Sequence, residues 1–257
     1  MRLFDTHCHF DFDIFAGDFA SQLQLAKKQC VERIMLPSVG PSNWERLLAL
    51  SSEYAGLYIA MGIHPYFLKS NSMQDLPSLY KLFDSPIETC HAIGECGLDG
   101  LIDIDYKVQR KVFGAQIELA NNLKFPLILH SRKTHNEVLQ QLKKYKFPFG
   151  GVLHGFSGSY QQAMQFVELG FYIGIGGVIT YPRARKTRQT AIDLPLECIV
   201  LETDSPDMPL YGEQGKPNHP SMLVQILSCL ANLRGIDEKL IAHSMWKNGN
   251  LAFKICE

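Results

Sequence analysis

Eight short apolar runs recur along this chain of 257 residues, and segments with the spacing of amphipathic helices lie between them. The runs are nearly continuous in apolar residues, a pattern typical of parallel strands buried on both faces. They cover residues 3–9, 33–39, 57–63, 92–96, 126–130, 151–154, 171–176 and 199–203. Strands that alternate with helices predict a parallel sheet. Eight such units predict a closed (β/α)8 barrel, the TIM-barrel fold, for which about 250 residues are typical.

Two of the helical segments carry recognisable signals. Residues 42–45, with the sequence Ser-Asn-Trp-Glu, match a capping box and predict a helix that buries Leu47, Leu48 and Leu50. Residues 221–233 carry apolar residues at helical spacing and are soon followed by a glycine, which favours a helix end. No domain linker interrupts the alternation, so we expect residues 1–257 to form one domain.

Composition narrows the functional classes. The formal net charge is −1, which excludes bulk electrostatic attraction to nucleic acid and leaves only a local cationic patch for a polyanion. The sequence contains no uncharged apolar run long enough to predict a membrane span, and residues 1–10 lack the pattern of a signal peptide. The seven cysteines are scattered, as expected of reduced thiols. We therefore expect a cytoplasmic protein without a membrane partner.

Metal-ligating side chains lie at the carboxyl ends of the predicted strands, where barrel enzymes build their active sites. His7 and His9 flank a single residue, so alternation along a strand would direct both rings to one face, together with Asp5. Polar ligands recur at the ends of later strands, namely His64, Glu95, His130, His154 and Asp204. The sequence therefore predicts a metal site at this end of the barrel.

The number of these ligands indicates two divalent metal ions. Four histidines and two carboxylates exceed what one tetrahedral ion binds. We expect Glu95 to bridge one ion held by His7, His9 and Asp204 and a second ion held by His130 and His154. Zinc is the expected metal, with manganese and magnesium as alternatives. Two ions roughly 3.5–4 Å apart suit phosphoryl transfer. Asp204 is then the candidate proton acceptor, and His64 the candidate group for binding phosphate or assisting the leaving oxygen.

In these motifs the chain resembles the TatD family of metal-dependent deoxyribonucleases, within the amidohydrolase superfamily. The resemblance extends from Asp-Thr-His-Cys-His through Gly-Ile-His-Pro, Gly-Glu-Cys-Gly-Leu-Asp, His-Ser-Arg and His-Gly-Phe-Ser-Gly to Glu-Thr-Asp-Ser-Pro and Lys-Pro-Asn-His-Pro. It implies a (β/α)8 barrel that uses divalent metals to hydrolyse DNA, commonly as a 3′→5′ exonuclease. The ligands that it implies are the same six residues, His7, His9, Glu95, His130, His154 and Asp204. Departures occur at Gly100, Gly155 and Pro217, outside this set.

Candidate substrate contacts come from two segments. Residues 180–188 carry four cations after the seventh predicted strand, and we expect Arg183 and Arg185 to bind phosphate. The resemblance implies further substrate contacts at Lys216 and Asn218. Four aromatic residues follow predicted strands and are candidates for stacking on unpaired bases, namely Phe10, Phe12, Tyr66 and Phe67.

Three functions remain open from the sequence. The favoured function is hydrolysis of DNA phosphodiester bonds, with single-stranded DNA or DNA 3′ ends as the partner and a monomeric enzyme. The second is hydrolysis of an amide or an aminoacyl ester, as in other members of the superfamily; Glu95 in place of a carboxylated lysine disfavours it. The third is a metal-stabilised scaffold, which gives no reason for Asp204 beside an open metal position.

Overall fold

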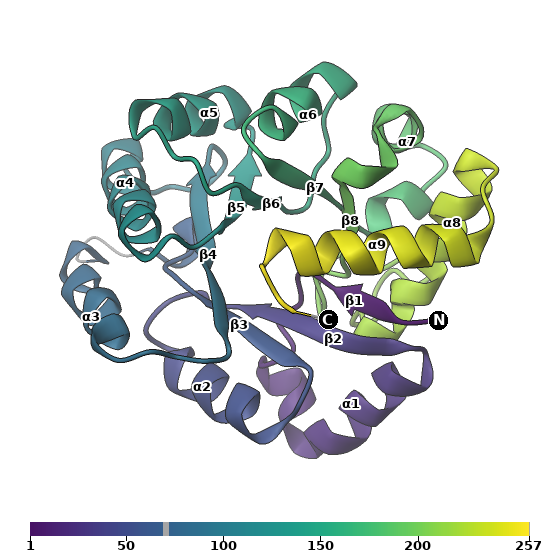
Figure 1. Cartoon of the computed structure of the whole chain (residues 1–257), viewed down its shortest axis with the longest axis horizontal. Helices are drawn as coiled ribbons and strands as arrows, with labels where there is room; N and C mark the ends of the chain where they lie inside the picture. The colour runs from purple at the N-terminus through teal and green to yellow at the C-terminus, as the bar shows by residue number, and fades with distance from the viewer. Residues whose placement is uncertain (69–71, 257) are drawn as a thin grey trace.

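Eight parallel strands form one sheet in the order β1 to β8, each hydrogen-bonded to its sequence neighbour (Figure 1). This computed structural model describes residues 1–68 and 72–256. The strands are β1 (Leu3–Asp5), β2 (Val31–Pro37), β3 (Leu57–Met61), β4 (Cys90–Asp99), β5 (Leu127–Arg132), β6 (Gly151–Leu153), β7 (Phe171–Ile175) and β8 (Ile199–Leu201). The predicted TIM-barrel fold is confirmed.

Hydrogen bonds beyond the strand ladder join the first strand to the last. The N–H of Thr6 donates to the carbonyl of Leu201 at 3.0 Å, and the N–H of Asp204 donates to the carbonyl of His7 at 2.9 Å. The carboxylate of Asp5 adds a side-chain link, because it accepts from the N–H of Thr203 at 2.9 Å and from its hydroxyl at 2.6 Å. These contacts close the barrel next to His7.

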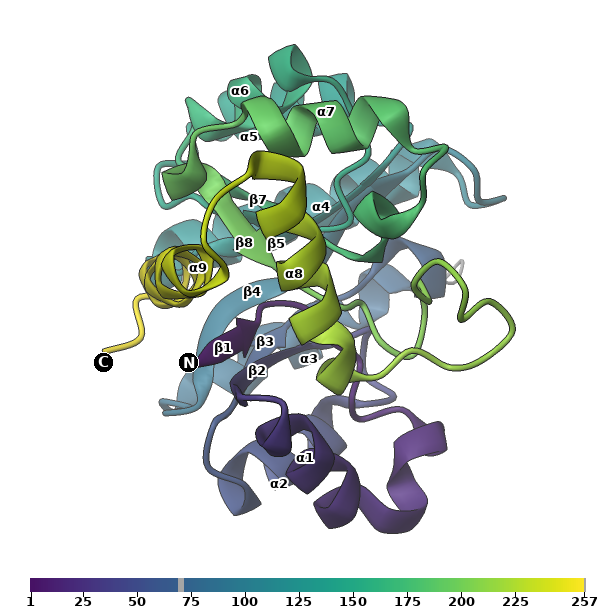
Figure 2. The same cartoon turned by 90° about the vertical axis from the view of Figure 1, so that its right-hand side faces the viewer.

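The helices surround the strands and cover one end of the barrel. They are α1 (Phe19–Lys28), α2 (Trp44–Glu53), α3 (Leu76–Lys81), α4 (Tyr106–Leu123), α5 (His135–Lys144), α6 (Tyr160–Val167), α7 (Arg185–Asp193), α8 (Leu223–Arg234) and α9 (Glu238–Ala252). Short 3₁₀ turns, such as η2 (Pro65–Phe67) and η7 (Pro220–Met222), lie in the connections. Helix α9 lies on the same side of the barrel as both termini (Figure 2).

The core has two parts. A large shell lies between the strands and the outer helices. A smaller cluster fills the barrel interior near α9, with buried side chains from seven strands and from the C-terminal segment. These are Phe4, Met35, Ala60, Ala92, Ile128, Val152, Val200, Trp246, Ala252, Phe253 and Ile255. Because side chains alternate along a strand, residues two positions later face the interior one layer higher, towards the carboxyl ends.

Two details of the sequence prediction are wrong. The capping box at residues 42–45 is absent: helix α2 begins after Asn43, whose side chain does not cap it. Instead, Asn43 accepts from the N–H of Val39 and donates to the carboxylate of Asp11, because a loop backbone group competes for the same amide. On α2, Leu47 is buried as expected, whereas Leu48 and Leu50 are half-buried.

Among the described residues, no helix is long and apolar enough to cross a membrane.

Candidate metal centre

Glu95 lies at the centre of a cluster of five histidines at the carboxyl ends of the strands. Its Oε2 is 3.0 Å from Nε2 of His7 and 3.4 Å from Nε2 of His9. Its Oε1 is 2.7 Å from Nε2 of His154 and 3.0 Å from Nδ1 of His130. The Nε2 of His64 lies 2.9 Å from the same Oε1. Each oxygen of one buried carboxylate therefore faces its own group of rings.

The alternation of the strands explains how these side chains converge. His130 and His154 lie two residues after Ile128 and Val152, which are members of the interior cluster. They therefore point into the barrel one layer above it. Strand β4 is longer than predicted and places Glu95 within it, where its register with β5 shifts between Ile93 and Cys96. Glu95 thus reaches the barrel axis from inside a strand, whereas the sequence predicted a strand end.

His7 and His9 come from irregular backbone. Strand β1 ends at Asp5, so the two histidines follow it in a segment that was predicted to be strand. Their rings still converge, with centroids 5.2 Å apart. The carboxylate of Asp5 accepts hydrogen bonds from Thr203 and does not face the cluster. It therefore holds the segment after β1 against the segment after β8. Asp204 has a left-handed backbone, with φ of 56°, and its Oδ1 lies 3.5 Å from Nε2 of His7.

The donor atoms fit divalent metal ions. Nε2 of His7 and Oε2 of Glu95 are buried only 3.0 Å apart, yet among the described residues neither makes a hydrogen bond of good geometry. Leaving buried polar atoms without partners is costly unless a ligand satisfies them. Imidazole and carboxylate are the ligand types that zinc and related ions prefer. The cluster groups into sets of three donors within 4.8 Å of one another, including His7, His9 and Glu95.

The electrostatics of the cluster favour cations. Burial alone would raise the pKa of Glu95, but the rings of His154, His64 and His7 hold it well below its usual range. The buried carboxylate is therefore ionised. Burial, together with the neighbouring His154, lowers the pKa of His7 well below its usual value, so this ring is a neutral ligand. A neutral imidazole beside an ionised carboxylate is the protonation state that metal binding requires. At His154 burial is outweighed by Glu95 and Asp204, which raise the pKa to about 10, so a metal ion would replace a proton on that ring.

Asp99 orients His130 from outside the cluster. Its Oδ2 lies 3.0 Å from Nε2 of His130, which leaves Nδ1 directed at Glu95. The other oxygen of Asp99 accepts from the N–H of Leu101 at 2.8 Å. A carboxylate that holds the second ring nitrogen fixes the tautomer and orientation of a ligating histidine. Asp99 was not predicted as a site residue, although the motif Gly-Leu-Asp places it four residues after Glu95.

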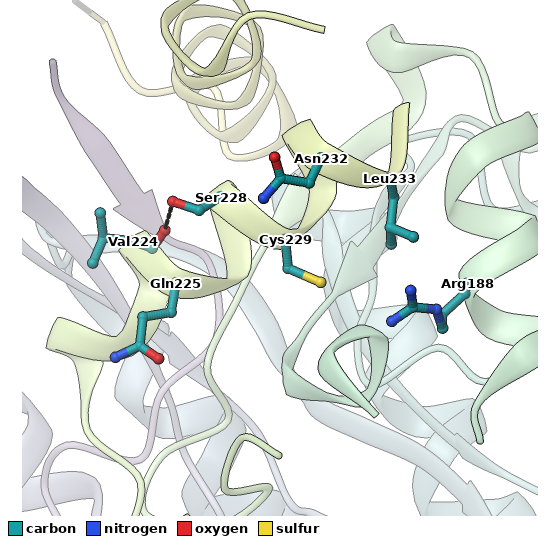
Figure 3. A pocket seen from close by; sticks show the side chains of 7 residues that line it. All are labelled: Arg188, Val224, Gln225, Ser228, Cys229, Asn232 and Leu233. Carbon is teal, nitrogen blue, oxygen red and sulfur yellow. Dashed lines mark hydrogen bonds between the residues drawn. The ribbon is translucent and has the colours of Figure 1, made fainter. Parts of the chain in front are cut away.

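Two cavities meet at the cluster and differ in their linings. One of about 270 Å3 is lined by His9, Phe12, His64, Tyr66, Phe67, Glu95, Asp99, His130, Arg132, His154, Asp204 and Asp207. The other, of about 760 Å3, shares His130, Arg132, His154 and Asp204 with it and extends past Lys133, His135 and Lys186. A separate pocket between α7 and α8 lies outside the barrel and contains no predicted site residue (Figure 3). The two cavities that contain predicted site residues of the cluster therefore both open at the strand ends.

The sequence signature of the family described as TatD related DNase matches residues 4–254 of this chain. The chain belongs to this family. The Escherichia coli K12 protein named uncharacterized metal-dependent hydrolase YjjV is 43% identical over 255 residues, which is 99% of this chain and 98% of that protein. An uncharacterized metal-dependent hydrolase of Haemophilus influenzae is 39% identical, over 96% of this chain and 98% of that protein.

Solved structures agree with this assignment. The crystal structure of YjjV, a TatD homologue, superposes with a TM-score of 0.96 at 42% identity and covers 99% of each chain. A TatD family hydrolase of Entamoeba histolytica has a TM-score of 0.88 at 19% identity, over 100% of this chain and 99% of that one, which supports the fold alone. This TatD-family protein is therefore a metal-dependent hydrolase with a His/Glu/Asp metal-binding cluster.

The structure of this TatD-family protein places the predicted substrate residues away from the cluster. Asn218 is buried, and its amide donates to the carbonyls of Thr203 and Met208, so it stabilises the loop after β8. Lys216 is exposed and pairs with Glu213 at 2.8 Å. Arg183 and Arg185 are exposed too, and Arg183 lies over the ring of Tyr181 rather than in either cavity at the cluster.

The four predicted stacking residues divide between core and surface. Phe10 is fully buried and packs against Phe15 and Phe19, so its prediction as a base-stacking residue is wrong. Phe12 is half-buried and stacks on the ring of His9 with centroids 4.9 Å apart. Tyr66 and Phe67 are 60% and 45% exposed and line the smaller cavity. An exposed aromatic pair beside a reactive centre is available to a substrate.

Sequence reasoning missed the cations that do face the cluster. Arg132 is the last residue of β5, Lys133 follows it directly, and Lys186 is the second residue of α7. Lys186 was predicted only as part of the cationic segment 180–188, in which the neighbouring arginines received the phosphate role. It also missed Glu202, a buried carboxylate that accepts from the N–H of Gly155 at 2.6 Å. Burial raises the pKa of Glu202 to about 8.

Proposed function

We propose that this protein hydrolyses phosphodiester bonds of DNA, with single strands or 3′ ends as its substrate. The observation that supports this proposal is the cationic lining of the larger cavity beside the metal-binding cluster. Arg132, Lys133 and Lys186 line that cavity together with His154 and Asp204. Arg132 lies 3.8 Å from Asp99, but Lys133 and Lys186 have no carboxylate partner among the described residues. Phosphate oxygens are the natural partners of such cations, whereas a neutral amide substrate would leave the two lysines unpaired.

We further propose that the centre holds two divalent ions, zinc first, with manganese and magnesium as alternatives. The two oxygens of Glu95 face different rings, which supports a bridging role. The first set of ligands would be His7, His9, Glu95 and Asp204, and the second Glu95, His130 and His154. Divalent ions so held act as Lewis acids and lower the pKa of water from about 15.7 to about 7.

Asp204 is the proposed proton acceptor. Burial raises its pKa, while His154 and His9 act in the opposite direction. Its side chain is 15% exposed and lines both cavities, so it lies where a water and a phosphodiester would meet. A carboxylate in that position takes the proton of the attacking water and holds the water in line with the phosphorus.

His64 is proposed to donate a hydrogen bond and not to bind metal. Its Nδ1 accepts the N–H of Tyr66 at 3.0 Å, so the ring's proton lies on Nε2. Burial lowers the pKa of His64 to about 4, which keeps the ring neutral. The N–H at Nε2 points to Oε1 of Glu95. A protonated Nε2 has no free lone pair to bind a metal ion. In the substrate complex this N–H would donate to a phosphate oxygen.

We also propose that the active enzyme is a monomer, because every member of the cluster comes from one chain. Light scattering of the active fraction tests this point. A dimer that loses its activity when it is diluted into monomers would contradict it.

A hydrolysis panel tests the proposed activity. Metal-free protein is loaded with zinc, manganese or magnesium and is assayed on a single-stranded oligonucleotide, bis(4-nitrophenyl) phosphate, an amide and an aminoacyl ester. We expect cleavage of both phosphodiesters and none in a matched Glu95→Gln preparation, which controls for contaminating nuclease. Hydrolysis of the amide or ester without cleavage of DNA would overturn the proposal in favour of the alternative.

A further inference from the structure

We propose that Lys133, Lys186 and the first turn of α5 form an anion subsite for a second phosphate of the substrate. The subsite would hold a phosphate adjacent to the one that is cleaved, so it selects chains of at least two phosphodiesters. This inference rests on the proposed function, because it identifies which phosphodiesters the centre prefers.

The subsite lies in the larger of the two cavities at the cluster. That cavity has a volume of about 760 Å3 and runs from His154 and Asp204 outwards to α5 and α7. Its volume is typical of pockets that bind ligands larger than a single phosphate group. A substrate held at the cluster would therefore continue past α5 and α7 without displacing any element of the fold.

Two of the cations in this cavity lack ionic partners. Lys133 and Lys186 are exposed, and no carboxylate among the described residues lies within 4.0 Å of either ammonium group. The single lining carboxylate besides Asp204 is Glu137, on the first turn of α5.

The first turn of α5 adds uncapped backbone donors. Thr134 precedes the helix, but its hydroxyl donates to the carbonyl of Leu98 and makes no cap. The first three residues of the helix, His135, Asn136 and Glu137, line the cavity. Free N–H groups and the helix dipole favour an anion at such a position, and here they lie beside the two lysines.

The ring of His135 lies close enough to both lysines for each of them to lower its pKa. Burial lowers the pKa of this ring first, Lys186 lowers it further, Glu137 raises it, and Lys133 lowers it again. The ring is held in place by Phe156 and Phe166, with centroids 5.6 and 6.1 Å away. An anion between the lysines would offset their effect on His135. The ring is therefore a reporter of the subsite that does not depend on hydrolysis.

The smaller cavity at the cluster has a more acidic lining. It carries Asp99, Asp207 and Glu95 beside the exposed rings of Tyr66 and Phe67, and its one arginine, Arg132, lies 3.8 Å from Asp99. A further phosphate would meet carboxylates there, whereas an uncharged nucleoside would meet aromatic faces. The phosphate chain is therefore expected to extend towards Lys133 and Lys186, and the terminal nucleoside towards Tyr66.

Activity measurements provide the first test. Wild type, Lys186→Gln, Lys133→Gln and a matched surface control, Lys111→Gln on α4, are loaded with metal and assayed on the thymidine dinucleotide and tetranucleotide. The wild type should prefer the tetranucleotide in kcat/KM. Each subsite variant should reduce that preference by about tenfold, as expected for the loss of one charge-assisted contact, mainly through KM. Lys111→Gln should match the wild type. An unchanged preference in both subsite variants would overturn the proposal.

Nuclear magnetic resonance of the metal-free protein gives the second test, because nothing is hydrolysed there. We expect the tetranucleotide to raise the pKa of His135 in the wild type and to raise it less in Lys186→Gln. An unchanged pKa at saturating tetranucleotide would overturn the subsite. Inorganic phosphate is the comparison: an equal shift at equal concentration would overturn the second-phosphate assignment in favour of a free-phosphate site. If the loaded wild type cleaves no phosphodiester, the proposed function fails, and this titration still decides the anion subsite.

Discussion

Oδ2 of Asp99 lies 3.0 Å from Nε2 of His130, while Nδ1 of the same ring lies 3.0 Å from Oε1 of Glu95. One imidazole thus connects the central carboxylate of the cluster to a second carboxylate outside it. Such an arrangement directs the lone pair of the ligating nitrogen towards the metal position. Because Asp99 belongs to none of the candidate donor sets, its contribution can be separated from that of the ligands.

Asp99→Asn should weaken metal binding or turnover by about 10–100-fold, the usual effect of losing such a partner. An asparagine keeps the shape but supplies no charge for the ring of His130. Metal affinity is measured by competition with a chelator, beside Asp103→Asn, which changes an exposed carboxylate in the following loop. Full affinity and full turnover in Asp99→Asn would mean that packing alone orients His130.

Glu95→Gln should lose more bound metal than His7→Ala. The glutamate faces both groups of histidines, whereas His7 belongs to one. Metal content is measured by elemental analysis after dialysis, with Glu45→Gln on the surface of α2 as a matched control. Thermal unfolding of each variant shows whether the barrel is intact. Equal metal content in Glu95→Gln and wild type would rule out the bridging role.

His64→Ala should retain its metal and still lose turnover. The N–H at Nε2 is the group removed, and loss of one donor to a developing negative charge costs about 10²–10³ in kcat. His64→Asn supplies an amide N–H and should recover part of the loss. Loss of metal in parallel with turnover would assign His64 to the ligands instead. Metal content and kcat measured on the same samples distinguish the two roles.

The barrel and the central cluster could be predicted because both depend on local patterns. Continuous apolar runs identify buried parallel strands whatever their neighbours, and barrel closure brings every carboxyl end to one face. The positions of His130 and His154 follow from this alone. Glu95 was correctly expected in the cluster, but it was expected at the end of a strand and lies within β4. The register shift in β4 that directs it inwards cannot be predicted from residue types.

The roles of loop residues could not be predicted, because their side chains form hydrogen bonds with backbone groups that only the folded structure brings near. Asn218 was expected at the substrate, but the carbonyls of Thr203 and Met208 use its amide. Arg183, Arg185 and Lys186 belong to one cationic segment, yet only Lys186 lines the cavity beside the cluster, although Arg185 lies in the same first turn of α7. Sequence shows the charge of such a segment, whereas helix geometry decides which member points inwards.

His219 should make the fold less stable in mild acid. Burial lowers the pKa of its ring to about 4, below the unfolded value of 6.5. Between these values the unfolded chain binds the extra proton, so stability falls as the pH drops from about 6.5 towards 4. His219→Asn keeps an acceptor for the N–H of Ser221, which bonds to Nδ1 at 3.0 Å, and removes the titration.

Denaturant unfolding of metal-free wild type and His219→Asn across this pH range measures the difference. Excess chelator ensures that loss of metal does not contribute to the slope. The variant should show the shallower decline. Identical slopes would mean that His219 does not contribute to the acid sensitivity of the fold.

Asp204→Asn should bind DNA nearly as well as wild type and turn it over about 10²–10⁴ times more slowly, the range expected for loss of a general base. Asparagine has a similar shape, but it cannot take a proton from water. The comparison is Asp207→Asn, which changes an exposed carboxylate of the smaller cavity. Single-turnover rates and metal content are measured together on one single-stranded oligonucleotide. Near-full turnover in a metal-replete Asp204→Asn protein would remove Asp204 as the proton acceptor. A matching loss of metal would instead show that its main role is that of a ligand.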